Sequence, residues 1–311
     1  MVTRPELNTR LPIDIQPEVY FALRTGQPIV AFETTILSFG LPQPLNMEVA
    51  LGCEKRARDL GVIPASIAML DGRIHIGLEK EQLEFFCSKN SEIRKVNPQN
   101  FASTLAMGKP GAFTVGGCLM VCALVGIRVF ATGGIGGIHR DWQVIPDVSS
   151  DLQALSRYQT ITVSAGAKSI LNIPATLEAL ETLGVPVVGW NTDKFPLFHC
   201  PTSQYPVSAR FDTAKDVAEF AKLHFQLNTG GILLAAPIPA EHAIEFEQLE
   251  KWITIALKEA SEQQVHGRDI TPFLLERLEK HSAGKSLEAN TELIFNNSTI
   301  AAQIALELAK L

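Results

Sequence analysis

The chain has 311 residues, of which 46% are apolar and 19% are charged, a composition typical of a soluble globular enzyme with a core of its own. The formal net charge is −6 and no long basic run occurs, which argues against nucleic-acid binding by a charged face but is compatible with a local phosphate site. Five scattered cysteines without a CxxC pair argue against a disulfide framework and indicate a reducing compartment.

The sequence contains no candidate for a membrane span or a targeting segment. The first residues lack an apolar signal core, and the longest apolar run, residues 118–127, is too short to cross a bilayer. We therefore expect a cytoplasmic protein that does not interact with membranes.

Short β-branched runs alternate with longer amphipathic segments, which predicts an α/β protein: a three-layer α/β/α fold with a large mixed, mostly parallel sheet. An Asp71-Gly72 turn within residues 65–77 predicts a hairpin, and the polar residues 282–289 predict a loop. We see no clean linker and predict one domain over residues 1–311. In chain order, the predicted elements are strand 28–34, helix 47–60, strand 65–70, helix 80–87, helix 116–125, strands 129–132 and 160–164, helix 169–183, strand 185–190, helix 214–226, strand 231–235, and helices 240–263 and 299–309.

Lys168 lies where an apolar strand breaks at small residues and a helix begins, on the rim where α/β sheets bind ligands. Desolvation by small apolar neighbours makes an amine easier to deprotonate, and a neutral amine can act as a nucleophile. An isolated lysine in this place is more often a surface residue. The neighbouring motifs favour the nucleophile.

Glu33 ends the first predicted strand and is followed by two threonines. A carboxyl group in such a place can hold its proton and serve as a general acid, or it can simply accept hydrogen bonds from nearby backbone. Lys95 adds a second lysine, which could bind a substrate phosphate or sit beside Lys168 as a like charge. Position alone leaves the alternatives for Glu33 open.

A glycine-rich turn follows the strand at residues 129–132, with the sequence TGGIGGIHR over residues 132–140. Four glycines in five positions let backbone N–H groups turn toward an anion, and Thr132, His139 and Arg140 add donors. The turn is neither a dinucleotide fingerprint nor a P-loop, because His139 replaces the third glycine and no Gly-Lys-Ser/Thr follows. A phosphate-binding turn is favoured over a merely structural one.

Two carboxylates four residues apart, Asp147 and Asp151, flank Ser149 and Ser150. They could hold a hard divalent cation with retained waters. The same residues also fit an ordinary helix N-cap, which the spacing alone favours.

Together these motifs resemble the pseudouridine-5'-phosphate glycosidase family, also called indigoidine synthase A-like, over about residues 15–308. The resemblance implies an α/β/α fold, a homotrimer, a divalent metal that is usually Mn²⁺, and reversible cleavage of pseudouridine 5'-phosphate into uracil and ribose 5-phosphate. The matching stretches are AFETTILS (31–38), PQPLN (42–46), VFATGGIGGIHR (129–140), DVSSDL (147–152), AGAKSIL (165–171), LEALETLGVP (177–186), PIP (237–239), TPFLL (271–275) and FNN (295–297).

By this resemblance Lys168 is the covalent nucleophile and Glu33 the proton donor. Asp147 is the better match to the metal ligand, with Asp151 sharing that role through water, and Asn297 or Asn296 would meet the base. The small-molecule ligand is expected to be a nucleotide or sugar phosphate. The expected substrate contacts are Lys95, Thr114, Val115, Thr132, Gly133, Gly134, His139, Ser149, Ser150, Asp151 and Asn297.

The chain departs from the family pattern at several positions. Phe39 replaces a histidine, Phe113 a threonine, Asn172 an aspartate and Ala236 an asparagine, and residues 97–100 read NPQN in place of a Ser-Arg-Arg-Asp type run. Lost hydrogen bonds to a base change specificity strongly. A C-glycoside synthase that joins ribose 5-phosphate to a different heterocycle, as in C-nucleoside biosynthesis, is therefore the alternative. A catalytically silent sugar-phosphate-binding protein would need a lost nucleophile, and both Lys168 and Glu33 are present.

Overall fold

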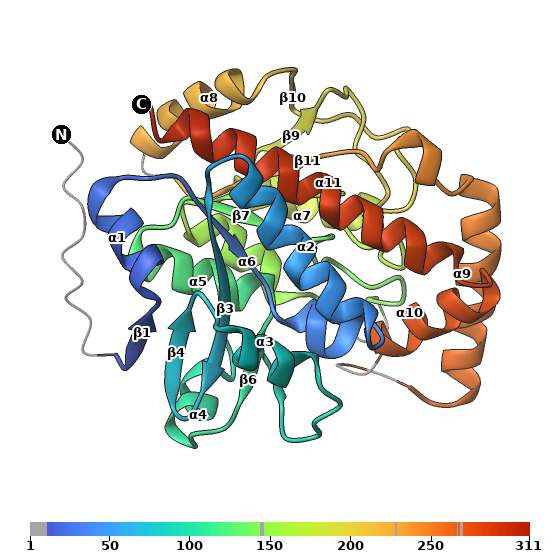
Figure 1. The fold of residues 1–311 in the computed structure, drawn as a ribbon. Coiled ribbons are helices and arrows are strands. Elements are labelled where there is room, and N and C mark those ends of the chain that lie inside the picture. The colour runs from blue at the N-terminus through green and yellow to red at the C-terminus, as the bar shows by residue number, and fades with distance from the viewer. Residues whose placement is uncertain (1–10, 144–145, 228, 266, 268–269) are drawn as a thin grey trace.

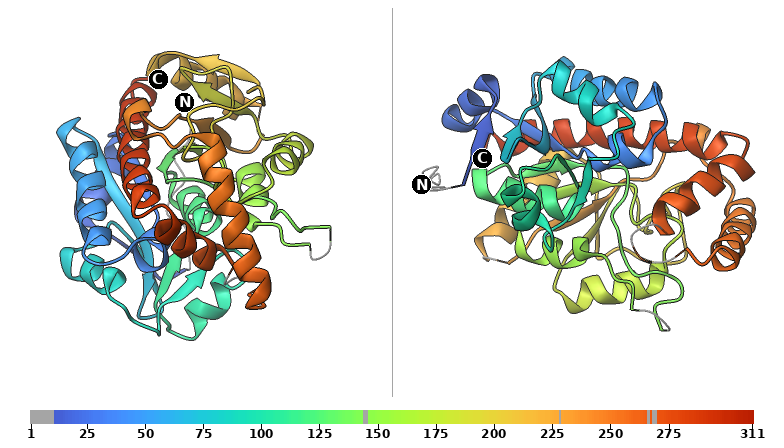
Figure 2. Two further views of the ribbon diagram at one scale, coloured as in Figure 1. Left: turned by 90° about the vertical axis from the view of Figure 1, so that its right-hand side faces the viewer. Right: turned by 90° about the horizontal axis from the view of Figure 1, so that it is seen from below.

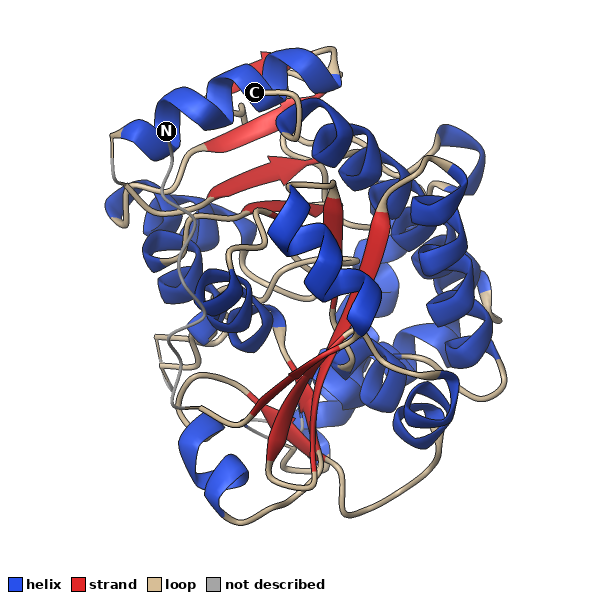
Figure 3. Cartoon of the chain, turned by 60° about the vertical axis from the view of Figure 1, so that its left-hand side comes forward, coloured by secondary structure: helices blue, strands red, loops and turns tan. Residues whose placement is uncertain are grey.

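The computed structural model describes residues 11–143, 146–227, 229–265, 267 and 270–311. Within these residues, eleven strands form one strongly twisted sheet (Figure 3). The main path runs β1-β4-β3-β2-β7-β8-β11-β9-β10, and β6 joins β5 to β3. The strands are β1 (Ile13–Ile15), β2 (Ile29–Phe32), β3 (Ile63–Leu70), β4 (Arg73–Ile76), β5 (Arg94–Val96), β6 (Gly111–Phe113), β7 (Val129–Ala131), β8 (Ile161–Ser164), β9 (Val187–Trp190), β10 (Ala209–Phe211) and β11 (Ile232–Ala235).

The sheet is mostly parallel. β3 pairs antiparallel with β4 and with β6, and the other described pairings are parallel. All residues of β2, β7, β8 and β11 are buried, as expected for parallel strands covered on both faces. The mixed, mostly parallel sheet predicted from the sequence is confirmed.

Helices cover both faces of the sheet (Figures 1 and 2). α11 packs across β2, β7 and β8 and contacts α2 and α8. On the other face of the sheet α5 contacts β2, α6 packs against α5, and α7 packs against α6. The helices are α1 (Pro17–Thr25), α2 (Leu45–Asp59), α3 (Lys80–Cys87), α4 (Phe101–Ala106), α5 (Val115–Val125), α6 (Ser150–Arg157), α7 (Ile173–Thr182), α8 (Ala214–Gln226), α9 (Phe246–Glu262), α10 (Ile270–His281) and α11 (Lys285–Leu308), with a π-turn η1 (Ile36–Gly40) and a 3₁₀ turn η2 (Ala240–His242). This is the three-layer α/β/α fold.

The hairpin at Asp71-Gly72 is confirmed. β3 and β4 pair antiparallel, and Asp71 and Gly72 have φ of 51° and 70°, as a tight two-residue turn requires. The prediction of one domain over residues 1–311 includes residues outside the described ranges and stays a prediction. No helix in the described part of the chain has both the length and the apolar character needed to cross a bilayer.

Three predicted boundaries are wrong. The helix predicted over 169–183 starts at Ile173, because Asn172 caps it and the preceding residues form the turn that carries Lys168. The helix predicted over 240–263 starts at Phe246, after η2. Of the predicted loop 282–289 only residues 282–284 form a turn, because α11 begins at Lys285 and runs to Leu308, through all but the last residue of the predicted helix 299–309.

The sequence patterns did not predict α1, α4, α6, α10, β1, β5, β6 or β10, most of which are short.

Candidate active site

The carboxyl ends of three adjacent strands bring the predicted reactive residues together. β2 ends at Phe32, which lies in register with Ala131 at the end of β7, and β7 in turn pairs with β8. Glu33 and Thr132 therefore follow neighbouring strands, and the Thr132 hydroxyl donates a hydrogen bond to the Glu33 carboxyl group. Ligands bind at this edge of parallel sheets.

Lys168 is placed by a fixed turn after β8. Its backbone N–H donates to the Ile135 carbonyl over 3.1 Å, and its own carbonyl accepts from Leu171 N–H over 3.0 Å. Gly166 has φ of +85°, and a Cβ at this position would collide with the Pro196 carbonyl oxygen. Only glycine suits this position, so the turn aims Lys168 in one direction.

A cavity of about 560 Å³, here called the polar cavity, holds most of the predicted residues. Lys168 and Glu33 form part of its wall, and Lys95 reaches it from β5. The other predicted residues that line it are Thr114, Val115, His139, Asp147, Ser149, Ser150 and Asp151.

A narrow space of about 40 Å³, here called the waist, continues from the polar cavity past Lys168 and Glu33. Thr132, Gly133 and Gly134 line it on one side. The remaining wall is more apolar and includes Ile36, Phe39, Phe198, Pro272, Leu275 and the amide of Asn290.

Burial raises the pKa of Glu33, against the opposing effects of the Lys168 charge and the Thr132 hydroxyl. Burial also lowers the pKa of Lys95, and repulsion from Lys168 adds to this shift. Desolvation lowers the pKa of His139, while the Asp147 carboxylate opposes that change from 3.8 Å. The site thus favours a carboxyl group that keeps its proton at higher pH than usual, as a general acid requires.

Asp151 organises the wall of the polar cavity. Its two carboxylate oxygens accept hydrogen bonds from Gly116 N–H over 2.8 Å and Gly136 N–H over 2.9 Å. Ser149 caps α6 by accepting from Asp151 N–H over 3.2 Å, so the capping interpretation of this segment is confirmed. The N-termini of α5 and α6 both face the cavity, and helix N-termini attract anions.

The glycine turn uses some of its N–H groups within the protein. The N–H groups of Ile135, Gly136, Ile138 and His139 donate to protein acceptors, whereas those of Gly133, Gly134 and Gly137 have no hydrogen-bond partner among the described residues. The predicted phosphate-binding turn therefore stays a prediction. Lys95 and the two helix N-termini offer a second candidate phosphate site.

Asn297 lines neither the polar cavity nor the waist. It is fully buried, and its amide nitrogen donates to the carbonyls of Thr132 and Gly133 over 2.8 and 3.2 Å, so it holds the glycine turn from α11. Asn296 donates to the Pro237 carbonyl over 3.1 Å. Asn290, about two turns before Asn297 on α11, lines the waist instead. No sequence motif singled it out, because the segment was expected to follow a loop.

The described residues offer little to a metal ion. They contain no group of three His, Cys, Asp or Glu side chains that could hold one. Asp151 uses both oxygens on backbone N–H groups, whereas the Asp147 carboxylate is partly exposed at the cavity. These residues fit an ion held by one carboxylate, with water and substrate as the other ligands.

Some of the residues that depart from the family pattern line the site, and others lie outside it. Phe113 is fully buried, stacks on Phe101 and does not reach the site. Asn172 caps α7, and Ala236 is fully buried after β11. Phe39 does line the waist, and Asn97 and Asn100 line the polar cavity.

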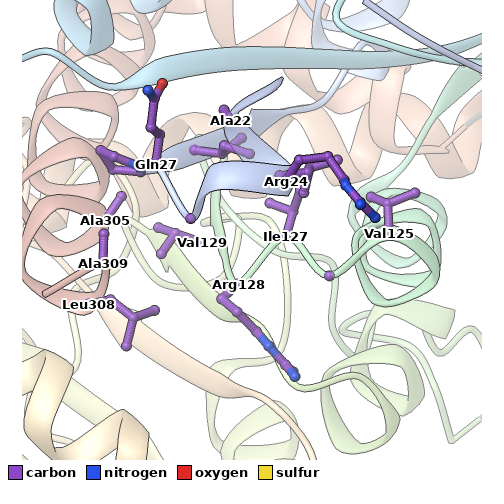
Figure 4. A pocket seen from close by; sticks show the side chains of 15 residues that line it. Ala22, Arg24, Gln27, Val125, Ile127, Arg128, Val129, Ala305, Leu308 and Ala309 are labelled. Carbon is purple, nitrogen blue, oxygen red and sulfur yellow. The ribbon is translucent and has the colours of Figure 1, made fainter. Parts of the chain in front are cut away.

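A separate cavity of about 420 Å³ lies at the opposite edge of the sheet, where β2 and β7 begin (Figure 4). Its wall is mostly apolar, with Arg24, Gln27 and Arg128 as polar members. The described residues that line it include no carboxylate, thiol, imidazole or primary amine. Its composition and its position away from the strand ends exclude it as the place of the chemistry.

Comparison with known proteins agrees with this geometry. The family described as indigoidine synthase A like protein matches residues 18–307. The chain is 45% identical to the pseudouridine-5'-phosphate glycosidase of Clostridium botulinum, covering 96% of this chain and 98% of that protein. The corresponding protein of Petrotoga mobilis is 43% identical, with 97% and 98% covered.

Two solved structures share the fold. The prealnumycin C-glycosynthase AlnA, in complex with ribulose 5-phosphate, superposes with a TM-score of 0.89 at 32% identity, covering 97% of this chain and 98% of that one. An indigoidine synthase A-like protein from Thermotoga maritima superposes with a TM-score of 0.88, also at 32% identity and with the same coverage. The chain belongs to the indigoidine synthase A-like family, which includes the pseudouridine-5'-phosphate glycosidases.

Proposed function

We propose that this enzyme cleaves the C–C glycosidic bond of pseudouridine 5'-phosphate reversibly, giving uracil and ribose 5-phosphate through a covalent adduct on Lys168. The activity named for its relatives supports this function. The observation that carries the roles of the residues is that Lys168 and Glu33 line both the polar cavity and the waist. One amine and one proton-holding carboxyl group therefore face the same small space.

Glu33 is the proposed general acid. A carbon leaving group cannot be released by protonating a glycosidic nitrogen, so the sugar ring must open first. Glu33 donates its proton to the ring oxygen, and the bond between that oxygen and C1' breaks with its electron pair moving to the oxygen. The raised pKa of Glu33 supports this role, because burial lets the carboxyl group keep its proton to higher pH than usual.

Lys168 is the proposed nucleophile. The neutral amine uses its electron pair to form a bond to C1'. The nitrogen, now positively charged, gives up one proton, and C5 of the base takes up one proton. The electron pair of the nitrogen then forms the C1'=N bond while the C1'–C5 bond breaks with its electron pair returning to the base, and uracil leaves. The remaining imine takes up water, which frees the amine and releases ribose 5-phosphate. The reverse sequence forms the C–C bond and releases water.

The phosphate is proposed to lie in the polar cavity. Lys95, Val115, Ser149 and Ser150 line this cavity, and the last three belong to the N-termini of α5 and α6. Helix N-termini and a lysine are a common anion site. The solved relative in complex with ribulose 5-phosphate supports a sugar phosphate as ligand.

We also propose that Asp147, whose carboxylate is partly exposed at the polar cavity, would hold Mn²⁺. When bound, the ion would neutralise charge on the phosphate. Asp151 contributes to the metal site only indirectly. Its carboxylate accepts hydrogen bonds from the N-terminus of α5 and from the glycine turn and so holds both in place. We further propose a homotrimer, from the family resemblance, and a cytoplasmic location, with which five unpaired buried cysteines agree.

A C-glycoside synthase acting on another heterocycle is the second candidate function. Phe39 favours it, because it adds an aromatic wall to the waist, and the 32% identical C-glycosynthase shows that the fold supports such chemistry. Phe113 no longer supports it, since it lies in the core. The activity named for the more similar relatives makes uracil the better supported base.

The proposal is tested by trapping the adduct. The protein is incubated with ribose 5-phosphate and borohydride, and the modified peptide is found by mass spectrometry. We expect a reduced ribose 5-phosphate adduct on Lys168 and turnover of pseudouridine 5'-phosphate with Mn²⁺. Lys168→Arg should abolish both, whereas Lys215→Arg on the exposed face of α8 should change neither. Unchanged turnover by Lys168→Arg would refute the covalent role.

A further inference from the structure

A third cavity, of about 360 Å³, opens on the other side of the waist, and is here called the side cavity. It lies between η1, the end of α3, α10 and the start of α11. Phe39, Gly40, Pro272, Leu275 and Asn290 line both this cavity and the waist. Glu33, Thr35, Lys95, Lys168 and Thr271 line both the waist and the polar cavity. The three spaces therefore form one passage, with the reactive residues at its narrow middle.

Both ends of the passage reach the surface. Exposed Arg94, Gln99 and Ser103 border the polar cavity, and exposed Gln43, Lys89 and Glu276 border the side cavity. The two mouths differ in charge. The polar cavity has the cations Arg94, Lys95 and Lys168 in its wall together with the carboxyl groups of Glu33, Asp147 and Asp151, and both oxygens of Asp151 accept backbone N–H groups. The side cavity has Glu276 and Glu279 against Lys89. A phosphate dianion is therefore less favoured at the mouth of the side cavity, where the carboxylates outnumber the cation.

The side cavity nevertheless suits a neutral polar ring. Its wall mixes apolar residues with amides and hydroxyls, and His199 is neutral at pH 7 because burial lowers its pKa to about 4. The side-chain oxygen of Asn290 is buried and has no hydrogen-bond partner within the described residues. It offers an acceptor to the N–H group of a base where the side cavity meets the waist.

The waist is the narrowest of the three spaces, about 40 Å³ against about 560 Å³ and 360 Å³ on its two sides, so movement of a side chain would open it for a base. Phe39 is placed for such a movement. Its backbone lies in the π-turn η1, where buried Leu37 and the hydrogen bond from Ser38 to the Phe86 carbonyl hold its neighbours, but its own side chain is 38% exposed. Leu275 of α10 forms the opposite wall.

We propose that uracil enters and leaves through the side cavity, past a gate formed by Phe39 and Leu275, while the sugar phosphate uses the polar cavity. This inference rests on the proposed function. It explains how the base can depart while ribose 5-phosphate, still bound to Lys168, fills the polar cavity. In the synthetic direction, uracil reaches the adduct without displacing it.

The test narrows each mouth separately with a tryptophan substitution and measures two steps, formation of the adduct and use of uracil. Adduct formation from ribose 5-phosphate is measured by borohydride trapping, and use of uracil by its KM in the synthesis of pseudouridine 5'-phosphate. Phe39→Trp and Leu275→Trp should raise the KM for uracil about tenfold and leave the trapping rate unchanged. Ser103→Trp, at the mouth of the polar cavity, should slow trapping and leave the KM for uracil unchanged. Phe21→Trp, on exposed α1, is the matched control and should change neither.

A base-binding wall is distinguished from a gate by the cleavage reaction. If Phe39 only gates free uracil, Phe39→Trp keeps kcat/KM for pseudouridine 5'-phosphate, which enters by the polar cavity, and lowers kcat and KM together through slow uracil release. Equal weakening of uracil and pseudouridine 5'-phosphate would overturn the gate. So would slower trapping in Phe39→Trp, or a raised uracil KM in Ser103→Trp. Absence of any adduct in the unmodified enzyme would instead refute the proposed function.

Discussion

The Thr132 hydroxyl donates a hydrogen bond to the Glu33 carboxyl group across the ends of two adjacent strands. This bond favours the charged carboxylate, whereas burial favours the neutral acid, and burial has the larger effect. The pKa of Glu33 therefore depends on the balance between these effects. Replacing the Thr132 hydroxyl by a methyl group would shift that balance.

Thr132→Val removes a bond that lowers the pKa of Glu33, so this pKa should rise further. Because the acid acts in its protonated form, the alkaline limb of the pH profile of kcat/KM should move to higher pH. The measurement is the pH dependence of pseudouridine 5'-phosphate cleavage. Thr254→Val, on exposed α9, should leave the profile unchanged. A limb that moves to lower pH would contradict the proposed role.

Glu33→Gln should lower kcat by about 10²–10⁴-fold, the usual contribution of a general acid. The same change should stabilise the fold at neutral pH. Above the ordinary pKa of 4.5 the unfolded chain loses this proton while the folded chain keeps it, so the stability of the unmodified protein falls as pH rises toward the folded pKa. Glutamine has no such dependence.

The stability difference is measured by urea unfolding of both proteins at several pH values. The advantage of the glutamine variant should be absent below pH about 4 and should grow as pH rises. Glu48→Gln, on the surface of α2, serves as the control and should show no such trend. A glutamine variant that is less stable at pH 7 would show that the carboxylate is well satisfied in the folded protein.

Much of this site could be predicted from the sequence, because parallel strands must end at one edge. Glu33, Thr132 and Lys168 each follow a buried strand, and that pattern suffices to bring them together. The role of Asp151 could not be predicted in this way. Its partners Gly116 and Gly136 lie 35 and 15 residues away, and only the folded chain shows that both oxygens are used.

The start of α11 was missed for a related reason. The polar residues of 282–289, among them Ser282 and Ser286, predict a loop, but in the fold these two serines and the following Asn290 are buried. The Ser282 hydroxyl accepts a hydrogen bond from Ser286 N–H over 3.0 Å and so satisfies a backbone donor in the first turn of α11. Tertiary burial overrides local propensity here. Because of this error, the sequence did not identify Asn290, which lines the waist, as a candidate site residue.

Asp147→Asn should shift the Mn²⁺ dependence of activity to higher metal concentrations, because the proposed ion loses its one protein carboxylate. It should also lower the pKa of His139 further, since the Asp147 charge opposes the effect of burial. Metal titration of activity and calorimetric binding of Mn²⁺ measure the first effect, and NMR titration of the imidazole the second. Asp193→Asn, in an exposed pair with Arg210, is the control. An unchanged metal titration would place the ion elsewhere.

Asp151→Asn should act on stability more than on metal binding. The amide keeps one acceptor oxygen and turns an NH₂ group toward an N–H donor, so one of the two backbone bonds is lost. Leaving such a group unsatisfied costs about 1–3 kcal/mol. Urea unfolding should show this loss, together with a higher KM for ribose 5-phosphate as the α5 N-terminus moves. Direct metal ligation would appear instead as a weaker Mn²⁺ affinity equal to that of Asp147→Asn.

Asn172→Asp restores the residue that family members usually carry and should change little. Asn172 lies four positions after Lys168 but points away from the polar cavity, accepting from Ala175 N–H over 3.0 Å as the N-cap of α7. Asparagine and aspartate cap equally well, so kcat/KM should be unchanged and stability should differ by no more than about 0.5 kcal/mol. Asn172→Ala, which removes the cap, should cost about 1 kcal/mol in urea unfolding and still leave adduct trapping intact. A gain in turnover by the aspartate variant would mean that this position acts on Lys168 through the turn, and that its substitution has reduced the activity of this enzyme.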